Sequence, residues 1–325
     1  MVLPLLAVIG GLILLTWSAD RFVFGASGAA RVLGVSPLLI GLTIVAFGTS
    51  APELLVSTLA SVQGNPGLAV GNAIGSNIAN IGLVLGAAAL AGPLLIGRGL
   101  VRRELPILLL ASLAVLLLLL DGTLGRLEGT ALLAGLIALV AWMVHASRRS
   151  RQAAGGPGAE SVDATAGGAP KAAGARAAWA WLAIGLLLLL AGSQALVWGA
   201  VEIAERLGVS ELVIGLTIVA IGTSLPELAT SVAAALRGET GLALGNIIGS
   251  NLFNLLAVLA VPALIAPLTV EPAVLVRDYP VMLALTGALL LIAFGRDGRI
   301  RRRHGVLLLA AFAGYLVHLA ITATA

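Results

Sequence analysis

Residues 41–54 read GLTIVAFGTSAPEL, and residues 215–228 read GLTIVAIGTSLPEL. The two stretches are identical at twelve of fourteen positions and lie 174 residues apart. A second pair follows at the same offset: residues 67–80 read GLAVGNAIGSNIAN and residues 241–254 read GLALGNIIGSNLFN, with ten of fourteen positions identical. The chain therefore consists of two related halves with no insertion between the paired blocks.

The composition places both halves in a lipid bilayer. Of 325 residues, 59% are hydrophobic and 10% are charged, and the mean hydropathy is +1.09. This is far more apolar than a soluble domain. Long runs such as residues 105–120 carry no charged residue, which indicates membrane helices and not the alternating strands of a barrel. The sequence predicts an all-α polytopic membrane protein.

The sequence also excludes cysteine-based sites and disfavours nucleic-acid binding. The chain contains no cysteine, so disulfides, thiolate metal sites and cysteine nucleophiles are excluded. The basic residues lie singly or in short clusters at the ends of apolar runs. This distribution is typical of membrane topology signals and not of nucleic-acid binding.

We expect ten transmembrane helices, five in each half. They span residues 2–24, 36–62, 67–91, 103–120, 127–146, 178–203, 211–236, 241–266, 273–294 and 304–321. The first repeat is expected at 1–146 and the second at 178–325, joined by a linker at 147–177 that is rich in Gly, Ala and Pro. Such a linker is expected to be loosely ordered.

The distribution of basic residues predicts the orientation. A cytoplasmic linker puts sixteen of the nineteen Lys and Arg residues on the cytoplasmic side of the inner membrane and both termini outside. Because each half has an odd number of helices, the second half enters the membrane from the opposite face. Inverted repeats of this kind are typical of secondary transporters, whose sites lie at the repeat interface near the midplane.

Glu53 and Glu227 are the acidic residues that fall deep inside predicted spans. A carboxylate there costs at least about 2.5–3.5 kcal/mol and normally faces a cavity and a partner. The symmetric pair favours a cation ligand over the alternative, a protonated carboxyl with a structural hydrogen bond. A proline precedes each glutamate, and by interrupting the helix it frees backbone carbonyls that a cation can satisfy.

Neutral oxygens surround the two glutamates in the sequence. The nearby hydroxyls belong to Thr49, Ser50, Thr223 and Ser224. The second blocks add Ser76, Asn80, Ser250 and Asn254, with each serine and asparagine four residues apart on one helical face. Oxygen-rich sites suit calcium and sodium. The alternative for the second blocks is that their glycines and small polar residues only allow close helix packing.

Both pairs of blocks resemble the alpha repeats of the calcium/cation antiporter superfamily, specifically the prokaryotic sodium/calcium exchangers. The resemblance implies the sodium/calcium exchanger fold, in which the second, third, seventh and eighth helices form the core and the first and sixth form a sliding bundle. It implies a calcium site made by the carboxylates of Glu53 and Glu227 and the backbone oxygens of Thr49 and Thr223. It also implies sodium sites that add Ser50, Ser224, Ser76, Ser250 and the backbone oxygens of Ala46 and Ala220, with Asn80 and Asn254 lining the middle position.

One position departs from the family pattern. Members often carry an aspartate where this chain has Asn254, so this core holds two acids and not three. Calcium with two glutamates is then charge-balanced, and three sodium ions would bring one extra charge, making exchange electrogenic. Asn254 also disfavours potassium dependence. Proton/calcium exchangers typically carry a GNxxE-type pattern, whereas this chain has GTSxPE twice.

These observations predict a sodium/calcium antiporter that works by alternating access. A proton-coupled calcium or divalent-cation antiporter is the alternative within transport, and a cation-binding scaffold without turnover is the alternative outside it. An enzyme is disfavoured because no nucleophile with a base, catalytic metal pattern or phosphate loop is recognisable. We expect no resident cofactor, a monomeric chain, and the lipid bilayer and the transported calcium and sodium ions as its partners.

Overall fold

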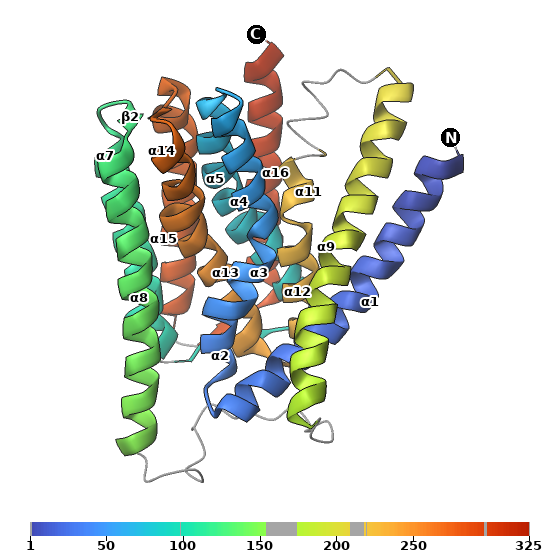
Figure 1. Ribbon diagram of the computed structural model, residues 1–325, viewed down its shortest axis with the longest axis vertical. Coiled ribbons are helices and arrows are strands. Elements are labelled where there is room, and N and C mark those ends of the chain that lie inside the picture. Colours follow the sequence, from blue (N-terminus) through green and yellow to red (C-terminus); the bar gives the residue numbers. More distant parts are fainter. Residues whose placement is uncertain are drawn as a thin grey trace.

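The computed structural model describes residues 2–97, 99–153, 174–208, 218, 220–295 and 298–324. Most of these residues are helical, and most helices run roughly along the long axis of the molecule (Figure 1). Within the described residues, seven helices are long and apolar enough to cross a membrane, and residues 37–62 add an eighth span if their two bent parts are counted as one. The protein is a helical, multi-pass membrane protein.

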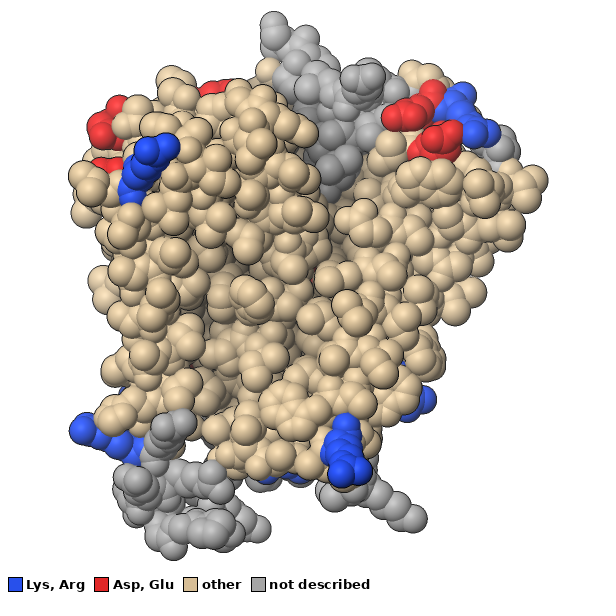
Figure 2. Space-filling view, viewed as in Figure 1, with Lys and Arg blue, Asp and Glu red and all other residues tan. Residues whose placement is uncertain are grey.

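Charged side chains gather at the two ends of the molecule and leave a broad uncharged band between them (Figure 2). In this view Lys and Arg dominate the lower end, and the visible Asp and Glu side chains lie at the upper end. Both chain termini also lie toward the upper end (Figure 1). An uncharged belt is what the hydrocarbon core of a bilayer requires. The two termini share one side, and its assignment to the outside remains a prediction.

Two long helices, α1 (Val2–Leu33) and α9 (Ala175–Arg206), pack against each other along their length (Figure 1). Glycines permit the close approach: a Cβ on Gly192 would lie 2.8 Å from the backbone nitrogen of Leu15, and one on Gly185 would lie 2.8 Å from that of Phe22. In lipid, where hydrophobic burial does not drive helix association, such close van der Waals contact does.

The helix that follows α1 is broken near its middle. Its segments are α2 (Pro37–Ile40), η1 (Gly41–Val45), α3 (Ala46–Thr49) and α4 (Ala51–Val62). The two parts meet at Ser50 with a bend of 44°. In the second half, α11 (Ala220–Thr223) and α12 (Leu225–Leu236) flank Ser224 in the same way. A proline in the first turn of α4 and of α12 lacks an N–H group to continue the preceding helix, so each helix restarts there.

The next helix of each half is the most buried of the candidate spans. The first-half helix comprises α5 (Pro66–Ala79), η2 (Asn80–Leu85) and α6 (Gly86–Ala91), and the second-half helix comprises α13 (Thr240–Phe253), η5 (Asn254–Val258) and α14 (Ala260–Ile265). A π-helical turn therefore begins at Asn80 in one half and at Asn254 in the other. Such wide turns often mark functional positions in helices.

The remaining elements surround this core. They are η3 (Leu100–Glu104), α7 (Leu105–Leu119), α8 (Arg126–Ala153), η6 (Val274–Asp278), α15 (Tyr279–Ala293) and α16 (Arg302–Thr324). Two short antiparallel strand pairs join the halves: β1 (Leu94–Leu95) with β4 (Arg299–Ile300), and β2 (Thr123–Leu124) with β3 (Leu268–Thr269). The opposing residues are Leu94 with Ile300 and Thr123 with Thr269.

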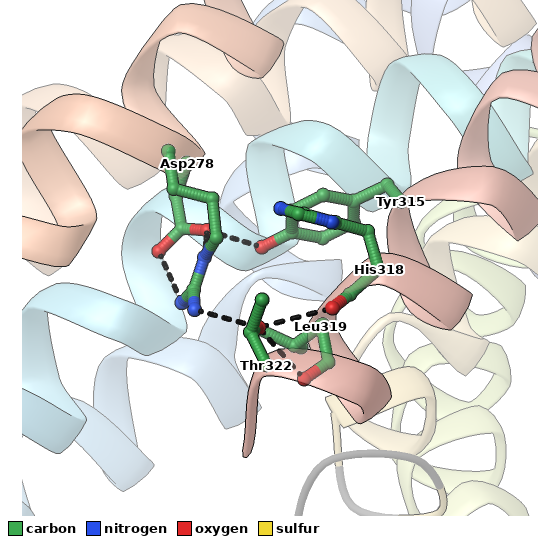
Figure 3. Close-up of polar contacts among 6 residues, drawn as sticks. Asp278, Tyr315, His318, Leu319 and Thr322 are labelled. Carbon is green, nitrogen blue, oxygen red and sulfur yellow. Dashed lines mark hydrogen bonds and ion pairs between the residues drawn. The ribbon is translucent and has the colours of Figure 1, made fainter. Parts of the chain in front are cut away.

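A polar cluster ties α16 to the start of α15 (Figure 3). The Asp278 carboxylate accepts a 3.0 Å hydrogen bond from the Tyr315 hydroxyl and bonds of 2.7 and 3.0 Å from the Arg277 guanidinium. Arg277 also donates to Thr322 Oγ1 at 3.3 Å. Because each of these four side chains bonds another of the four, we infer that the cluster anchors α16 to the rest of the protein.

Several helices extend beyond their predicted bounds. Helix α1 ends at Leu33 and not near residue 24, and α8 continues to Ala153, into the linker predicted at 147–177. Arg, Gln and Ala favour helix, so α8 continues for two turns past its apolar run. Linker residues 154–173 and residues 211–217 and 219 of the predicted 211–236 helix lie outside the described residues. The count of ten spans and the domain boundaries therefore stay predictions.

Candidate cation-binding site at the centre of the bundle

The broken helix of each half lies against the buried helix of the other half. In the first half, η1 and α3 contact α13, and in the second half α11 contacts α5. Glycines bring the first pair close: a Cβ on Gly245 would lie 3.0 Å from the Cα of Gly41. Within each half, α4 also packs on α5, and α12 packs on α13. Both helix breaks therefore face the centre of the bundle.

Glu53 and Glu227 lie just after these breaks, and each is 1% exposed. Each carboxylate is contacted by the serine at the break of the opposite half. Ser50 Oγ donates to Glu227 Oε1 at 3.0 Å, and Ser224 Oγ lies 3.5 Å from Glu53 Oε1. Ser250 Oγ, on α13, also lies 3.5 Å from Glu227 Oε1. The two glutamates are thus held by hydroxyls from both halves.

Several buried polar atoms near this point have no hydrogen-bond partner among the described residues. They are the Oε2 atoms of Glu53 and Glu227, Ser76 Oγ, Asn80 Oδ1, and both amide atoms of Asn254. An unpaired buried polar group costs about 1–3 kcal/mol, and more if it is charged. Most of these atoms are oxygens, and a hard cation is a ligand that satisfies several oxygens at once.

Thr49 and Ala46 belong to the same network. Thr49 is fully buried, and its Oγ1 lies 3.1 Å from Asn246 Oδ1, 3.3 Å from the Ala46 carbonyl oxygen and 3.5 Å from Ser250 Oγ. The Ala46 carbonyl also accepts from the backbone N–H of Ser50 at 3.0 Å. Thus the first-half break, the second-half glutamate and α13 form one hydrogen-bonded unit.

The other predicted site residues lie on the helices around that network. Thr223 is half-buried in α11, and Ala220 begins the same helix. Ser76, Asn80 and Asn254 are at most 2% exposed. No hydrogen bond between described residues links these three to the glutamates. They lie on the buried helices α5–η2 and α13–η5, which pack against α4 and α12.

The donor set limits the chemistry of the site. Among the described residues, no group of three or more His, Cys, Asp or Glu side chains comes together. Two carboxylates with neutral hydroxyl, amide and carbonyl oxygens suit hard cations such as calcium and sodium, and do not suit zinc or copper.

Two residues of the centre were missed by sequence reasoning. Asn72 Nδ2 donates to the Glu53 carbonyl oxygen at 3.0 Å and to Ser57 Oγ at 2.8 Å. Asn246 Nδ2 donates to the Glu227 carbonyl oxygen at 3.4 Å and to Ser231 Oγ at 2.9 Å. The signal was present, because the Gly-Asn pair that contains each asparagine is identical in the two copies of the second block.

A pair of buried carboxylates between broken membrane helices is an arrangement typical of an ion transporter and not of an enzyme. The sequence model of the family described as sodium/calcium exchanger protein matches residues 3–145 and 177–321. The chain belongs to this sodium/calcium exchanger family, and it is a transporter.

Relatives and a solved structure match this chain over nearly its whole length. CaxA of Alkalimonas amylolytica is 50% identical over 317 residues, which are 97% of this chain and 98% of that protein. The inner membrane protein YrbG of Escherichia coli strain K12 is 42% identical over 320 residues, which are 98% and 97% of the two chains. A structure of the sodium-calcium exchanger NCX_Mj, soaked with zero Na⁺ and Ca²⁺, superimposes with a TM-score of 0.83 at 35% identity, covering 98% of this chain and 99% of that one.

Proposed function

We propose that this protein exchanges sodium for calcium across the cytoplasmic membrane by alternating access. The observation that carries the proposal is the pair Glu53 and Glu227, both buried, each contacted by a serine of the opposite half and each with an unpaired second oxygen. A divalent ion between them neutralises two charges that lipid and protein cannot solvate.

The proposed ligands are those that the family resemblance implies. Calcium takes the two carboxylates and the backbone oxygens of Thr49 and Thr223. Sodium ions use the same glutamates with Ser50, Ser224, Ser76, Ser250 and the backbone oxygens of Ala46 and Ala220, while Asn80 and Asn254 line the middle position. The unpaired atoms of Ser76, Asn80 and Asn254 support this assignment.

The proposed mechanism uses an inverted repeat of five plus five helices with both termini outside. The repeated offset of 174 residues supports it, because the π-helical turns begin at Asn80 and Asn254 and the helix breaks fall at Ser50 and Ser224. Two halves of opposite orientation give one site access to both sides of the membrane in turn. With two acids in the core, exchange of three sodium ions for one calcium ion carries one net charge.

The test is uptake of radiolabelled calcium by proteoliposomes loaded with sodium. Uptake that requires internal sodium supports the proposal. Uptake that requires a pH gradient and ignores sodium replaces it with a proton-coupled calcium antiporter. Binding of calcium by the purified protein without either flux would indicate a cation-binding protein without turnover.

A further inference from the structure

Asn72 and Asn246 are outside the ligand set proposed above, yet they make the same two contacts in their own halves. Each donates its amide N–H groups to the main-chain carbonyl of the glutamate and to a serine hydroxyl one turn later. The serines, Ser57 and Ser231, are fully buried. Each asparagine therefore holds the backbone turn that carries the carboxylate.

These contacts connect neighbouring helices at the glutamates. Asn72 lies on α5 and reaches α4, while Asn246 lies on α13 and reaches α12. Ser57 Oγ donates in turn to the Ala69 carbonyl at 3.2 Å, which adds a second link between α4 and α5. Hydrogen bonds in a buried, low-dielectric centre are strong, and losing one partner leaves the other unsatisfied.

Asn246 makes one contact more. It is fully buried, and its Oδ1 accepts a 3.1 Å hydrogen bond from Thr49 Oγ1 of the first half. One amide group therefore touches the backbone of Glu227 and the side chain of Thr49. In the proposed function, Glu227 and Thr49 ligate the same calcium ion from opposite halves.

We propose that Asn72 and Asn246 are positioning residues for the transported cation, and that Asn246 fixes the distance between the second-half glutamate and the first-half threonine. Calcium requires several oxygens at 2.3–2.6 Å at the same time, so a looser ligand frame weakens calcium binding. This inference rests on the proposed function. It adds Asn72 and Asn246 to the proposed site as residues that do not themselves touch the ion.

The first test compares Asn246→Ala with Asn251→Ala. Asn251 is on the same helix and equally buried, but its amide donates to the Ile247 carbonyl of its own helix at 2.7 Å. We expect Asn246→Ala to raise the KM for calcium about tenfold, as the loss of one to two buried hydrogen bonds implies, with the maximum rate nearly unchanged. Asn251→Ala is expected to keep the wild-type KM. A fall in maximum rate at constant KM in Asn246→Ala would overturn the inference.

The second test is a double-mutant cycle between Asn246→Ala and Thr49→Val, read as calcium KM and as calcium binding to purified protein. Thr49→Val removes the hydroxyl donor and keeps the backbone oxygen. If Asn246 acts on calcium through Thr49, the double variant is little worse than the more affected single variant. Additive effects would refute the link between the halves.

The two tests separate this inference from the proposed function. Sodium-dependent calcium uptake by the wild-type protein is measured first in the same vesicles. No such uptake contradicts the proposed function. Sodium-dependent uptake with a wild-type KM in Asn246→Ala contradicts the positioning role alone. Elution volume and melting temperature in detergent identify any variant that fails to fold, and Asn246→Ser, which removes the amide and adds no charge, then replaces Asn246→Ala.

Discussion

The hydroxyl of Ser50 donates a 3.0 Å hydrogen bond to Oε1 of Glu227, the glutamate of the other half of the chain. Its counterpart contact, from Ser224 to Glu53 Oε1, is longer at 3.5 Å. Each half therefore contributes a donor to the other half's carboxylate, and the two contacts differ in strength. The difference leads to the first of four predictions.

Ser50→Ala is expected to weaken calcium transport more than Ser224→Ala. A hydrogen bond to a charged group contributes about 1.5–3 kcal/mol, and a bond at 3.5 Å is close to the limit of such an interaction. We expect the calcium KM to rise about tenfold or more in Ser50→Ala and by a smaller factor in Ser224→Ala. Calcium uptake at varied external calcium measures both. Equal changes in the two KM values would show that the difference between the 3.0 Å and 3.5 Å contacts does not affect calcium binding.

Glu53→Gln and Glu227→Gln are each expected to abolish calcium uptake in a folded protein. Either change leaves one negative charge opposite a divalent ion in a buried site, so the ion is no longer neutralised. Uptake into sodium-loaded proteoliposomes and elution volume in detergent measure activity and folding. Normal flux in either variant would remove that glutamate from the site.

Asn254→Asp is expected to make calcium–calcium exchange depend on the membrane potential. Two carboxylates with calcium form a neutral core, so calcium–calcium exchange by the wild-type protein should be insensitive to membrane potential. A third carboxylate leaves a net charge of −1 on the calcium-loaded core, and moving it costs up to about 2.3 kcal/mol per 100 mV.

Calcium–calcium exchange in proteoliposomes with a clamped potassium diffusion potential measures this effect. Asn254→Ala is the matched control, because it removes the amide without adding charge and should remain voltage-insensitive. Voltage dependence of calcium–calcium exchange in the wild-type protein would contradict the two-carboxylate core.

Asp20 on α1 forms an ion pair with Arg237, at the end of α12, with a distance of 2.6 Å. In the other half, the corresponding positions are the neutral residues Gln63 and Gln194. Helix α1 packs along α12, whereas α9 makes almost no contact with α4. The ion pair therefore links α1 to α12, and among the described residues no ion pair joins the corresponding positions Gln63 and Gln194. The Asp20–Arg237 pair is part-exposed, so it adds little to overall stability.

Cross-linking tests this one-sided contact, because the chain has no cysteine of its own. A bifunctional thiol reagent joining Asp20→Cys and Arg237→Cys is expected to arrest calcium exchange, since the family resemblance implies that the first and sixth helices, α1 and α9, slide relative to the core. The pair Gln63→Cys with Gln194→Cys is expected to cross-link only when the transporter adopts the opposite conformation. Full activity of the cross-linked Asp20–Arg237 variant would show that α1 does not move there.

The sequence determined the class of fold and the pair of carboxylates. Long uncharged runs cannot be stable in water, and an acidic residue inside such a run requires a partner, so Glu53 and Glu227 stood out without coordinates. The repeat at a constant offset of 174 residues related the two halves and predicted where both helix breaks would fall. Residue type, hydropathy and internal repeats follow from the order of residues alone and do not depend on how the helices pack.

Only the tertiary structure decided which half supplies each contact. Ser50 is three residues from Glu53 in the sequence, yet its hydroxyl bonds Glu227, 177 residues away. In the same way Thr49 meets Asn246 across the centre of the bundle. These pairings follow from the crossing of α3 and α13, where glycines let the backbones approach. A crossing of distant helices is set by packing in three dimensions, and the spacing of residues along one chain does not encode it.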